Sequence, residues 1–131
     1  YDKRHQGACM NANEIIAYCL KKKNAYIDHP FGDIPICVKV QNKIFAQVYP
    51  KATDFKITLK CEPMFGDFYR QMYPNTVVRG YHCPPVQQPY WNTVYMNGEV
   101  ADDVLESMIN HAYKAVISKL PRKVQKELED S

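Results

Sequence analysis

Lysines at the polar positions of alternating segments are the residues whose spacing first suggests chemistry. Lys39, Lys56 and Lys60 alternate with apolar residues in short β-type segments, and Lys43 follows a predicted turn at Gln41-Asn42. Because successive side chains of a strand point to opposite faces of a sheet, we expect these ammonium groups on the face away from the core. A sheet that presents lysines on its open side suits the phosphates of a polyanion.

The distribution of charge supports this prediction only weakly. The chain of 131 residues has a formal net charge of +3, and the segment from Ile34 to Gly98 holds seven basic and three acidic residues. A basic middle can attract phosphate. The alternative is a solvated lysine face that serves solubility, and composition alone favours that alternative.

A second set of candidate contacts surrounds a proline-rich loop. Arg79 ends a short predicted strand, and His82 and Trp91 flank the loop. A histidine near an indole can contact phosphate or stack on a base. The alternative, which we favour, is that His82 bonds the loop backbone and Trp91 anchors the sheet edge, because a single Trp in a small domain is usually mostly buried. The candidate nucleic-acid-binding residues are Lys39, Lys43, Lys56, Lys60, Arg79, His82 and Trp91.

Catalytic and metal chemistry find little support in the sequence. His82 and Cys83 are adjacent, so on an extended chain they point to opposite faces and do not form a nucleophile–base pair. No Ser-His-Asp set, glycine-rich phosphate loop or carboxylate pair is recognisable, and we expect no enzyme and no cofactor. Asp28, His29 and Asp33 lack a fourth ligand, so no metal is expected there.

The five cysteines indicate whether the protein resides in an oxidising or a reducing compartment. They are odd in number and far apart, and no two form a Cys-x-x-Cys pair. We interpret them as reduced thiols, mostly buried, in a cytoplasmic protein. No apolar run approaches the roughly 20 residues that a membrane helix needs, so no membrane contact is expected.

Periodicity predicts the elements that must position the lysines. Residues 1–10 show no pattern and are expected to be an expression remnant or a disordered arm, ahead of a single domain at residues 11–131. The predicted helices are 11–23, 62–73, 101–120 and 122–129, and the predicted strands are 36–41, 43–49, 55–61, 76–79 and 90–96. In the second strand, alternation places Ile44, Ala46 and Val48 in the core and Phe45 outside it. The lysine triplet 21–23 falls in the last turn of the first helix, where positive charge suits the helix dipole, and we prefer this role to a phosphate contact.

Several local patterns, in order, carry a family resemblance. They are His29-Pro30-Phe31-Gly32, Lys43-Ile44-Phe45-Ala46, Ile57-Thr58-Leu59-Lys60-Cys61-Glu62-Pro63, Gly80-Tyr81-His82, Trp91-Asn92-Thr93-Val94 and Asn97-Gly98 leading to Ala112-Tyr113 and Lys119-Leu120-Pro121. Together they resemble the MmcQ/YjbR family of small bacterial proteins over about residues 11–128. The sequence departs from the family pattern at Ala101, where members often carry Pro, and near Asn110-His111.

The resemblance implies an α+β fold of two layers, in which an antiparallel sheet of about five strands carries helices on one face. The shape would be related to secretion-chaperone-like and frataxin-like folds. Members are commonly described as DNA-binding through a "double wing" of hairpins, which is an inference from fold.

Three hypotheses about function remain at this point. The preferred one is a DNA-binding protein that contacts phosphates through the basic sheet face with little sequence readout, as a monomer or weak homodimer. The alternative is a protein-interaction adaptor that uses the sheet face or the aromatic Tyr81–Trp91 region. The third is a small-molecule or metal site around His29 and His82.

Overall fold

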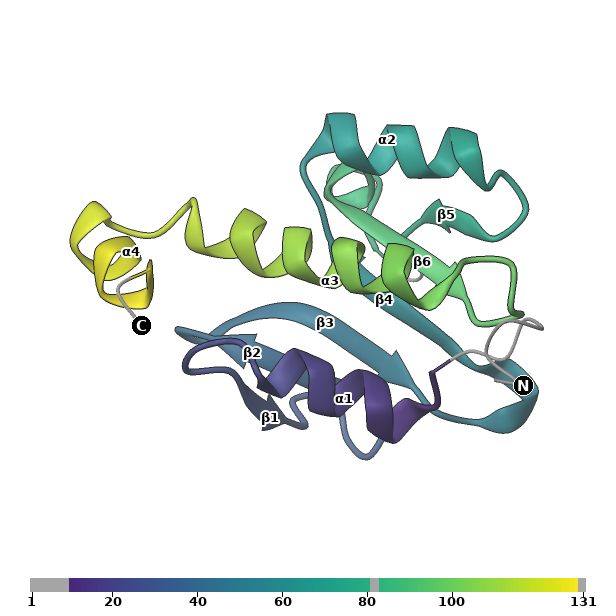
Figure 1. The fold of residues 1–131 in the computed structure, drawn as a ribbon, viewed down its shortest axis with the longest axis horizontal. Coiled ribbons are helices and arrows are strands. Elements are labelled where there is room, and N and C mark those ends of the chain that lie inside the picture. Colours follow the sequence, from purple (N-terminus) through teal and green to yellow (C-terminus); the bar gives the residue numbers. More distant parts are fainter. Residues whose placement is uncertain (1–9, 81–82, 130–131) are drawn as a thin grey trace.

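An antiparallel sheet forms one of two layers in the computed structural model, which describes residues 10–80 and 83–129 (Figure 1). Its order is β1-β2-β3-β4-β6-β5. The strands are β1 (Tyr26–Asp28), β2 (Ile36–Val40), β3 (Lys43–Tyr49), β4 (Lys56–Lys60), β5 (Val77–Arg79) and β6 (Trp91–Tyr95). The helices are α1 (Ala12–Leu20), α2 (Pro63–Met72), α3 (Asp102–Ile117) and α4 (Arg122–Glu129), with short 3-10 turns η2 (Ala52–Asp54) and η3 (Gln88–Tyr90).

This architecture confirms the predicted α+β fold with helices on one face of an antiparallel sheet. Helix α3 crosses β2, β3 and β4, α1 lies beside it on β2 and β3, and α2 packs against β5 and β6 (Figure 1). The sheet has six strands rather than about five, because Tyr26–Asp28 pairs with β2. Alternation cannot reveal so short a strand next to a turn-rich segment.

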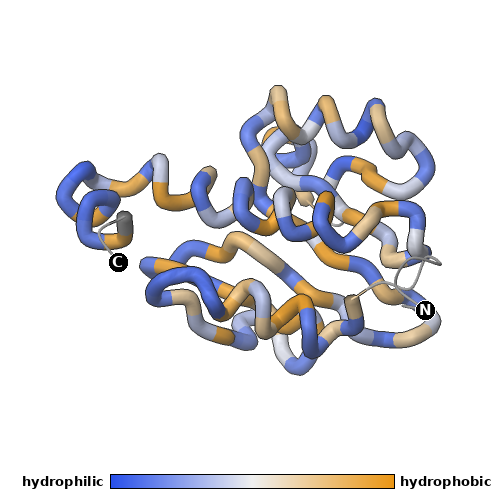
Figure 2. The backbone as a smooth tube through the Cα atoms, viewed as in Figure 1, coloured by the Kyte–Doolittle hydropathy of each residue, from blue (hydrophilic) through white to orange (hydrophobic). Residues whose placement is uncertain are grey.

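The hydrophobic core lies between the sheet and helices α1 and α3. Figure 2 shows hydrophobic and hydrophilic segments alternating along α3. The buried side chains of that helix repeat at helical spacing, as predicted, and they are Leu105, Met108, Ile109, Ala112, Tyr113, Ala115, Val116 and Ile117. The sheet supplies the other half of the core from one face, chiefly Val38, Val40, Ala46, Val48, Ile57, Leu59 and Val94.

The start of α1 was predicted correctly, and its end was not. The capping box at its start is confirmed, since Glu14 N donates to Asn11 Oδ1 at 2.8 Å and Asn11 N donates to Glu14 Oε1 at 2.9 Å. The helix ends at Leu20 and Lys21 is its C-cap, so the prediction that the three lysines lie in the last turn was wrong. Lys22 bonds Asn110 of α3, and Lys23 Nζ donates to the Glu127 carbonyl of α4 at 2.9 Å. Lys22 and Lys23 therefore join the end of α1 to two other helices.

Met10 belongs to the folded part of the chain. Its side chain is buried in the core, and its backbone N–H donates to Asp102 Oδ1 at 3.0 Å. The prediction of an arm at residues 1–10 was therefore wrong at this residue, while residues 1–9 lie outside the described part of the chain.

Three of the described cysteines are buried thiols and the fourth is partly exposed. Cys19, Cys37 and Cys61 are buried, Cys83 is intermediate, and Cys9 lies outside the described residues. Burial raises the pKa of Cys19 to about 12 and that of Cys61 to about 11. These two thiols stay protonated at neutral pH and serve as small apolar core residues.

A β-bulge reverses the predicted facing of two residues in β3. Val38 pairs with Ala46 but Lys39 pairs with Ile44, so Phe45 is an extra residue between the two pairs. The ring of Phe45 is fully buried and meets Tyr113 of α3 edge to face, with centroids 5.5 Å apart. Ile44 is consequently on the open face. The prediction that Ile44 is core and Phe45 is outside was wrong, because strict alternation does not hold across a bulge.

Helix α2 is fastened to β6 through a buried amide. Asn92 Nδ2 donates to the Gly66 carbonyl at 3.1 Å, and Arg70 Nη1 donates to Asn92 Oδ1 at 2.6 Å. A Cβ at Gly66 would lie 2.6 Å from Cys61 Sγ, so the helix approaches the sheet more closely than another residue would permit. The opposite side of α2 leaves four large apolar side chains exposed, namely Met64, Phe65, Phe68 and Met72.

Within residues 10–80 and 83–129, no helix combines the length and the apolar character that crossing a bilayer requires.

The bulge leads to a comparison of two neighbouring substitutions. Phe45→Ala should lower the free energy of unfolding by about 3–5 kcal/mol, because it empties a fully buried site. Ile44→Ala should cost less than about 2 kcal/mol, since Ile44 is only half-buried on the open face. Urea unfolding of the two variants measures both values, and the reverse order of costs would contradict the bulge.

Candidate nucleic-acid interface

Two adjoining hollows lie at the face of the sheet that the helices leave open and at the neighbouring end of the sheet, close to the end of α3. We call the first the lysine hollow, of about 440 Å³, which is lined by Asn42, Lys43, Ile44, Lys60, Trp91, Val116, Lys119 and Leu120. The second, the aromatic hollow, has about 640 Å³ and is lined by rings and apolar groups that include Phe31, Ile34, Tyr49 and Trp91. Ile44 and Trp91 line both hollows, so the two adjoin at these side chains, and we refer to them together as the groove.

Strand pairing explains where the lysine hollow forms. Strand β3 begins at Lys43, but its pairing with β4 extends only from Tyr49 to Ala46. Beyond the bulge, β3 leaves β4, and Lys60 at the end of β4 keeps only its pairing with Trp91 of β6. The opening is lined by Val116 of α3 and by Lys119 and Leu120, which follow the end of that helix.

Three lysine side chains line the lysine hollow, and its described lining residues include no carboxylate. Lys43 and Lys119 are exposed, and Lys60 is half-buried. Lys60 Nζ lies 5.2 Å from the ring centroids of both Tyr90 and Trp91. Burial lowers the pKa of Lys60, and Lys119 lowers it further, while Cys61 and Glu62 act in the opposite direction. An anion in this hollow would stabilise the charged form of Lys60.

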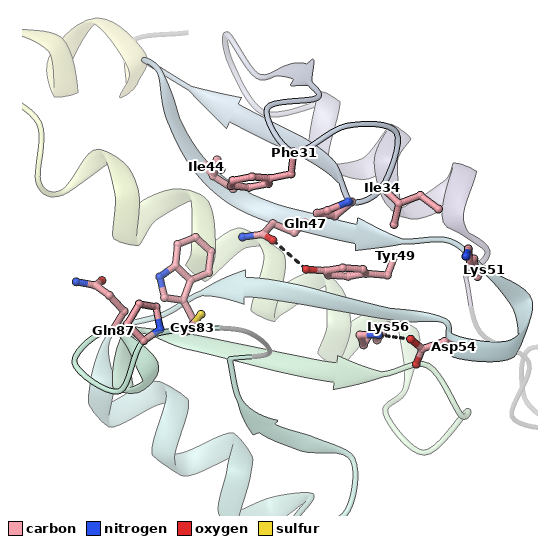
Figure 3. A pocket seen from close by; sticks show the side chains of 13 residues that line it. Phe31, Ile34, Ile44, Gln47, Tyr49, Lys51, Asp54, Lys56, Cys83 and Gln87 are labelled. Carbon is pink, nitrogen blue, oxygen red and sulfur yellow. Dashed lines mark hydrogen bonds and ion pairs between the residues drawn. The ribbon is translucent and has the colours of Figure 1, made fainter.

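The aromatic hollow lies between two loops that rise from the open face. Figure 3 shows Phe31 and Ile34 on one side, Cys83 and Gln87 on the other, and Gln47 and Tyr49 between them. Tyr49 Oη donates to Gln47 Oε1 at 3.3 Å across the floor. The ring of Phe31 is 63% exposed, so a large apolar surface is available to a ligand.

Lys39 and Lys56 share this face but do not present free charge to solvent. Lys39 Nζ pairs with Asp28 Oδ2 at 2.7 Å, and this bond lowers the pKa of Asp28. Lys56 is only 2% exposed, pairs with Asp54, and has its Nζ 4.7 Å from the centroid of the Tyr49 ring. The parity prediction for both lysines is confirmed, but the expectation that they project outward as open charges was wrong. Parity gives the face of a side chain and does not reveal its partner.

Arg79 and His82 are not brought to the groove by the described structure. Arg79 is exposed on the edge strand β5 and pairs with Asn92, whose side chain bonds α2 on the helix-bearing face. Because directly paired residues share a face, Arg79 lies on the side opposite the lysines. His82 lies outside the described residues. Of the predicted set, the structure brings together Lys43, Lys60 and Trp91.

Trp91 is held in the middle of the groove by its neighbours. It is half-buried on β6, which lies between β4 and β5, so it does not sit at the sheet edge. Gly80 N donates to the Trp91 carbonyl at 2.9 Å, and a Cβ at Gly80 would lie 2.7 Å from Trp91 Cβ. Gly80 is therefore required for space beside Trp91.

Of the three residues considered as metal ligands, Asp28 has other partners. Asp28 pairs with Lys39 and also accepts the His29 backbone N–H at 2.8 Å. Among residues 10–80 and 83–129, no three His, Cys, Asp or Glu side chains gather in a way that would hold a metal ion.

Several groove residues were not among the candidates from sequence. Lys119 comes from the end of α3, and its proximity to Lys43 depends on how the helix crosses the sheet. Phe31 and Ile34 belong to a segment read only as a turn. The available signal was this apolar pair in a segment rich in Pro, Gly and Asp, because binding residues are often found on loops.

Comparison with known proteins identifies the family. A family model described as YjbR matches residues 20–115. The chain belongs to the YjbR family. The resemblance inferred from sequence is thereby confirmed. The match extends from the last residue of α1 to near the end of α3.

Two relatives of this YjbR-family chain are named as uncharacterised proteins. The Escherichia coli (strain K12) protein named "Uncharacterized protein YjbR" is 24% identical over 119 residues, which are 91% of this chain and 98% of that protein. "Uncharacterized protein YbdF" of Escherichia coli O157:H7 is 28% identical over 99 residues, or 76% of this chain and 78% of that protein.

Solved structures show the same fold. The crystal structure of Deinococcus radiodurans protein DR2400 superposes with a TM-score of 0.81 at 23% identity, over 91% of this chain and 88% of that one. A Pseudomonas syringae protein superposes with a TM-score of 0.64 at 22% identity, over 80% of this chain and 97% of that one. At these identities the likeness concerns the fold alone.

The pairing of Lys56 predicts that its charge is dispensable. Lys56→Met keeps most of the aliphatic stem and leaves Asp54 in water, so the free energy of unfolding should change by no more than about 1 kcal/mol. Lys56→Ala should cost on the order of 2 kcal/mol through lost packing. Neither variant should change the salt dependence of binding to a polyanion. Urea unfolding and a salt-titrated binding assay measure the two quantities, and a reduced salt slope for Lys56→Met would show that its ammonium contacts the ligand.

Proposed function

We propose that this protein binds nucleic acid through the open face of its sheet, with the lysine hollow contacting phosphates and with little sequence readout. The observation that carries the proposal is that Lys43, Lys60 and Lys119 line one hollow whose described lining has no carboxylate. The function is binding without a catalytic step.

The electrostatics of the open face support a local site rather than a broad basic surface. Asp28 and Asp54 pair with Lys39 and Lys56, which leaves three lysines together at the end of the groove where β3 leaves β4 and one exposed lysine, Lys51, in the lining of the aromatic hollow. Contacts from lysines to phosphate position a nucleic acid without reading its bases. This arrangement agrees with the proposed lack of sequence preference.

Removal of two lysines from the hollow tests the proposal. Lys43→Ala/Lys119→Ala should weaken binding to DNA and should reduce the slope of log affinity against log salt by about 1.4 to 1.8, because each phosphate contact contributes about 0.7 to 0.9. Fluorescence anisotropy with labelled DNA over a salt series measures the slope. Both side chains are exposed, so the fold should not suffer.

A matched control removes the same charge from elsewhere on the surface. Lys21→Ala/Lys123→Ala changes two exposed lysines that line neither hollow. We expect its salt slope to equal that of the unaltered protein. Equal losses in the two double variants would mean that net charge alone drives binding, and undetectable binding of the unaltered protein at low salt would remove the proposal.

As a second candidate function, we infer a protein contact through α2. Met64 is 86% exposed, and Phe65, Phe68 and Met72 are each more than half exposed on the same helix. A contiguous stripe of this kind marks an interaction surface more often than isolated apolar residues do. The adaptor hypothesis placed the contact at the sheet face or in the Tyr81–Trp91 region, and α2 is a different surface. An equal stripe complements it under two-fold symmetry, so the occupant we propose is α2 of a second copy.

Sedimentation over a series of protein concentrations tests this contact. The unaltered chain should form dimers that dissociate on dilution, and Phe68→Glu should remain monomeric because it places two carboxylates in an apolar interface. Thr53→Glu, at an exposed residue of η2, adds the same charge away from α2 and should still form dimers. A monomer at every concentration would exclude self-association through α2.

A further inference from the structure

We propose that the groove takes a single strand of nucleic acid, with one unstacked base in the aromatic hollow against Trp91 and the adjoining phosphate in the lysine hollow. This inference rests on the proposed function, since it assigns the class of nucleic acid that the same site binds. It depends on the arrangement of the two hollows along one groove.

The chemistry of the aromatic hollow suits the face of a base. Its rings come from three separate parts of the chain, with Phe31 before β2, Tyr49 at the end of β3 and Trp91 at the start of β6. Stacking on such rings is tolerant of sequence because every base has a π-face. In a duplex these faces are covered by neighbouring base pairs, so its bases cannot stack on the rings of this hollow.

The size of the aromatic hollow agrees with one small ligand group. Its volume of about 640 Å³ lies within the range of about 300–1,000 Å³ that is usual for small-molecule sites. The loops that carry Phe31 and Gln87 stand on either side of it (Figure 3). A duplex would rest on these loops and reach only the exposed lysines at the rim.

The neighbouring positions of the two hollows match the structure of a nucleotide. Ile44 and Trp91 line both, so a base seated on one side of Trp91 has its backbone beside Lys60. Lys60 Nζ is 5.2 Å from the Trp91 ring centroid, which places the cation and the stacking surface at one point. A base and its phosphate can therefore be bound together.

The polar groups on the floor of the aromatic hollow are largely engaged with one another. The oxygen of Gln47 already accepts the Tyr49 hydroxyl, which leaves its amide N–H groups, and Lys56 and Asp54 bond each other. The other polar side chains of the lining, Gln87 and Lys51, are exposed and are not held in one position by the walls of the hollow. We therefore expect a large difference in affinity between a strand with bases and an abasic strand, and a small difference between strands of different bases.

Trp91 is the only tryptophan in the chain, so its fluorescence reports on the site directly. We would titrate the full chain at low salt with an oligothymidylate, an abasic oligonucleotide of the same length and phosphate number, and a duplex of that length. The oligothymidylate should bind at least about fivefold more tightly than the abasic strand and should quench Trp91, because stacking contributes about 1–3 kcal/mol per base. The abasic strand should bind without quenching. An oligouridylate shows whether DNA or RNA is preferred, and either preference supports the inference.

A pair of exposed phenylalanines provides matched variants. Phe31→Ala, at the groove wall, should lower affinity for oligothymidylate severalfold and leave affinity for the abasic strand unchanged. Phe68→Ala removes an exposed ring from α2, outside both hollows, and should change neither. Because Phe31 is 63% exposed, its loss should not unfold the chain, and circular dichroism checks this.

The outcomes separate the inference from the function on which it rests. Equal affinities for oligothymidylate and the abasic strand, with no change in Trp91 fluorescence, would overturn the single-strand inference and leave the phosphate contact in place. Tighter binding of the duplex than of the oligothymidylate would also overturn it. Failure of all the nucleic acids to bind at low salt would overturn both.

Discussion

The departure of β3 from β4 is the constraint on which the groove depends. A single extra residue, Phe45, is taken into the core against Tyr113, and the strand then continues with Ile44 on the open face. Because β3 no longer pairs with β4 beyond Ala46, Lys43 and Lys60 border an opening instead of a continuous ladder. A bulge that serves core packing thus also creates the hollow that three lysines line, and bulges commonly redirect side chains in this way.

The sequence was sufficient for all the helices, for five of the six strands and for most of their facings, and insufficient for β1 and for the bulge. Alternation in β4 is unambiguous because Lys56, Thr58 and Lys60 alternate with apolar residues, and in β2 Lys39 marks the open face. In β3, Ile44, Phe45 and Ala46 are all apolar, so two registers fit the same pattern and only the packing of Phe45 against α3 decides between them. The family resemblance was readable because turn residues and apolar positions recur in order, which is information about fold more than about function.

The sequence predicts which face of the sheet a lysine lies on better than it predicts whether that lysine is ion-paired. The pair of Lys56 with Asp54 lies within three residues, so its proximity in sequence was a usable signal. The pair of Lys39 with Asp28 requires β1, a strand of three residues that alternation did not reveal. Lys119 required knowledge of where a helix of 16 residues ends over the sheet. Long-range partners decide whether a surface lysine is a free charge, and they follow from tertiary structure alone.

The lysines of the open face are not equivalent. If all of their ammonium groups were free, a polyanion would have many equivalent ways to lie across the sheet. Asp28 pairs with Lys39 beside the β2–β3 turn, and Asp54 pairs with Lys56 farther along the sheet. Lys43, Lys60 and Lys119 line the lysine hollow together, whereas Lys51 is a single exposed lysine in the lining of the aromatic hollow. A phosphate is therefore favoured most in the lysine hollow, and the pairing that limits the total charge also defines an orientation. The partial burial of Lys60 strengthens this preference, because an ammonium with reduced hydration gains more from an anion than an exposed one does.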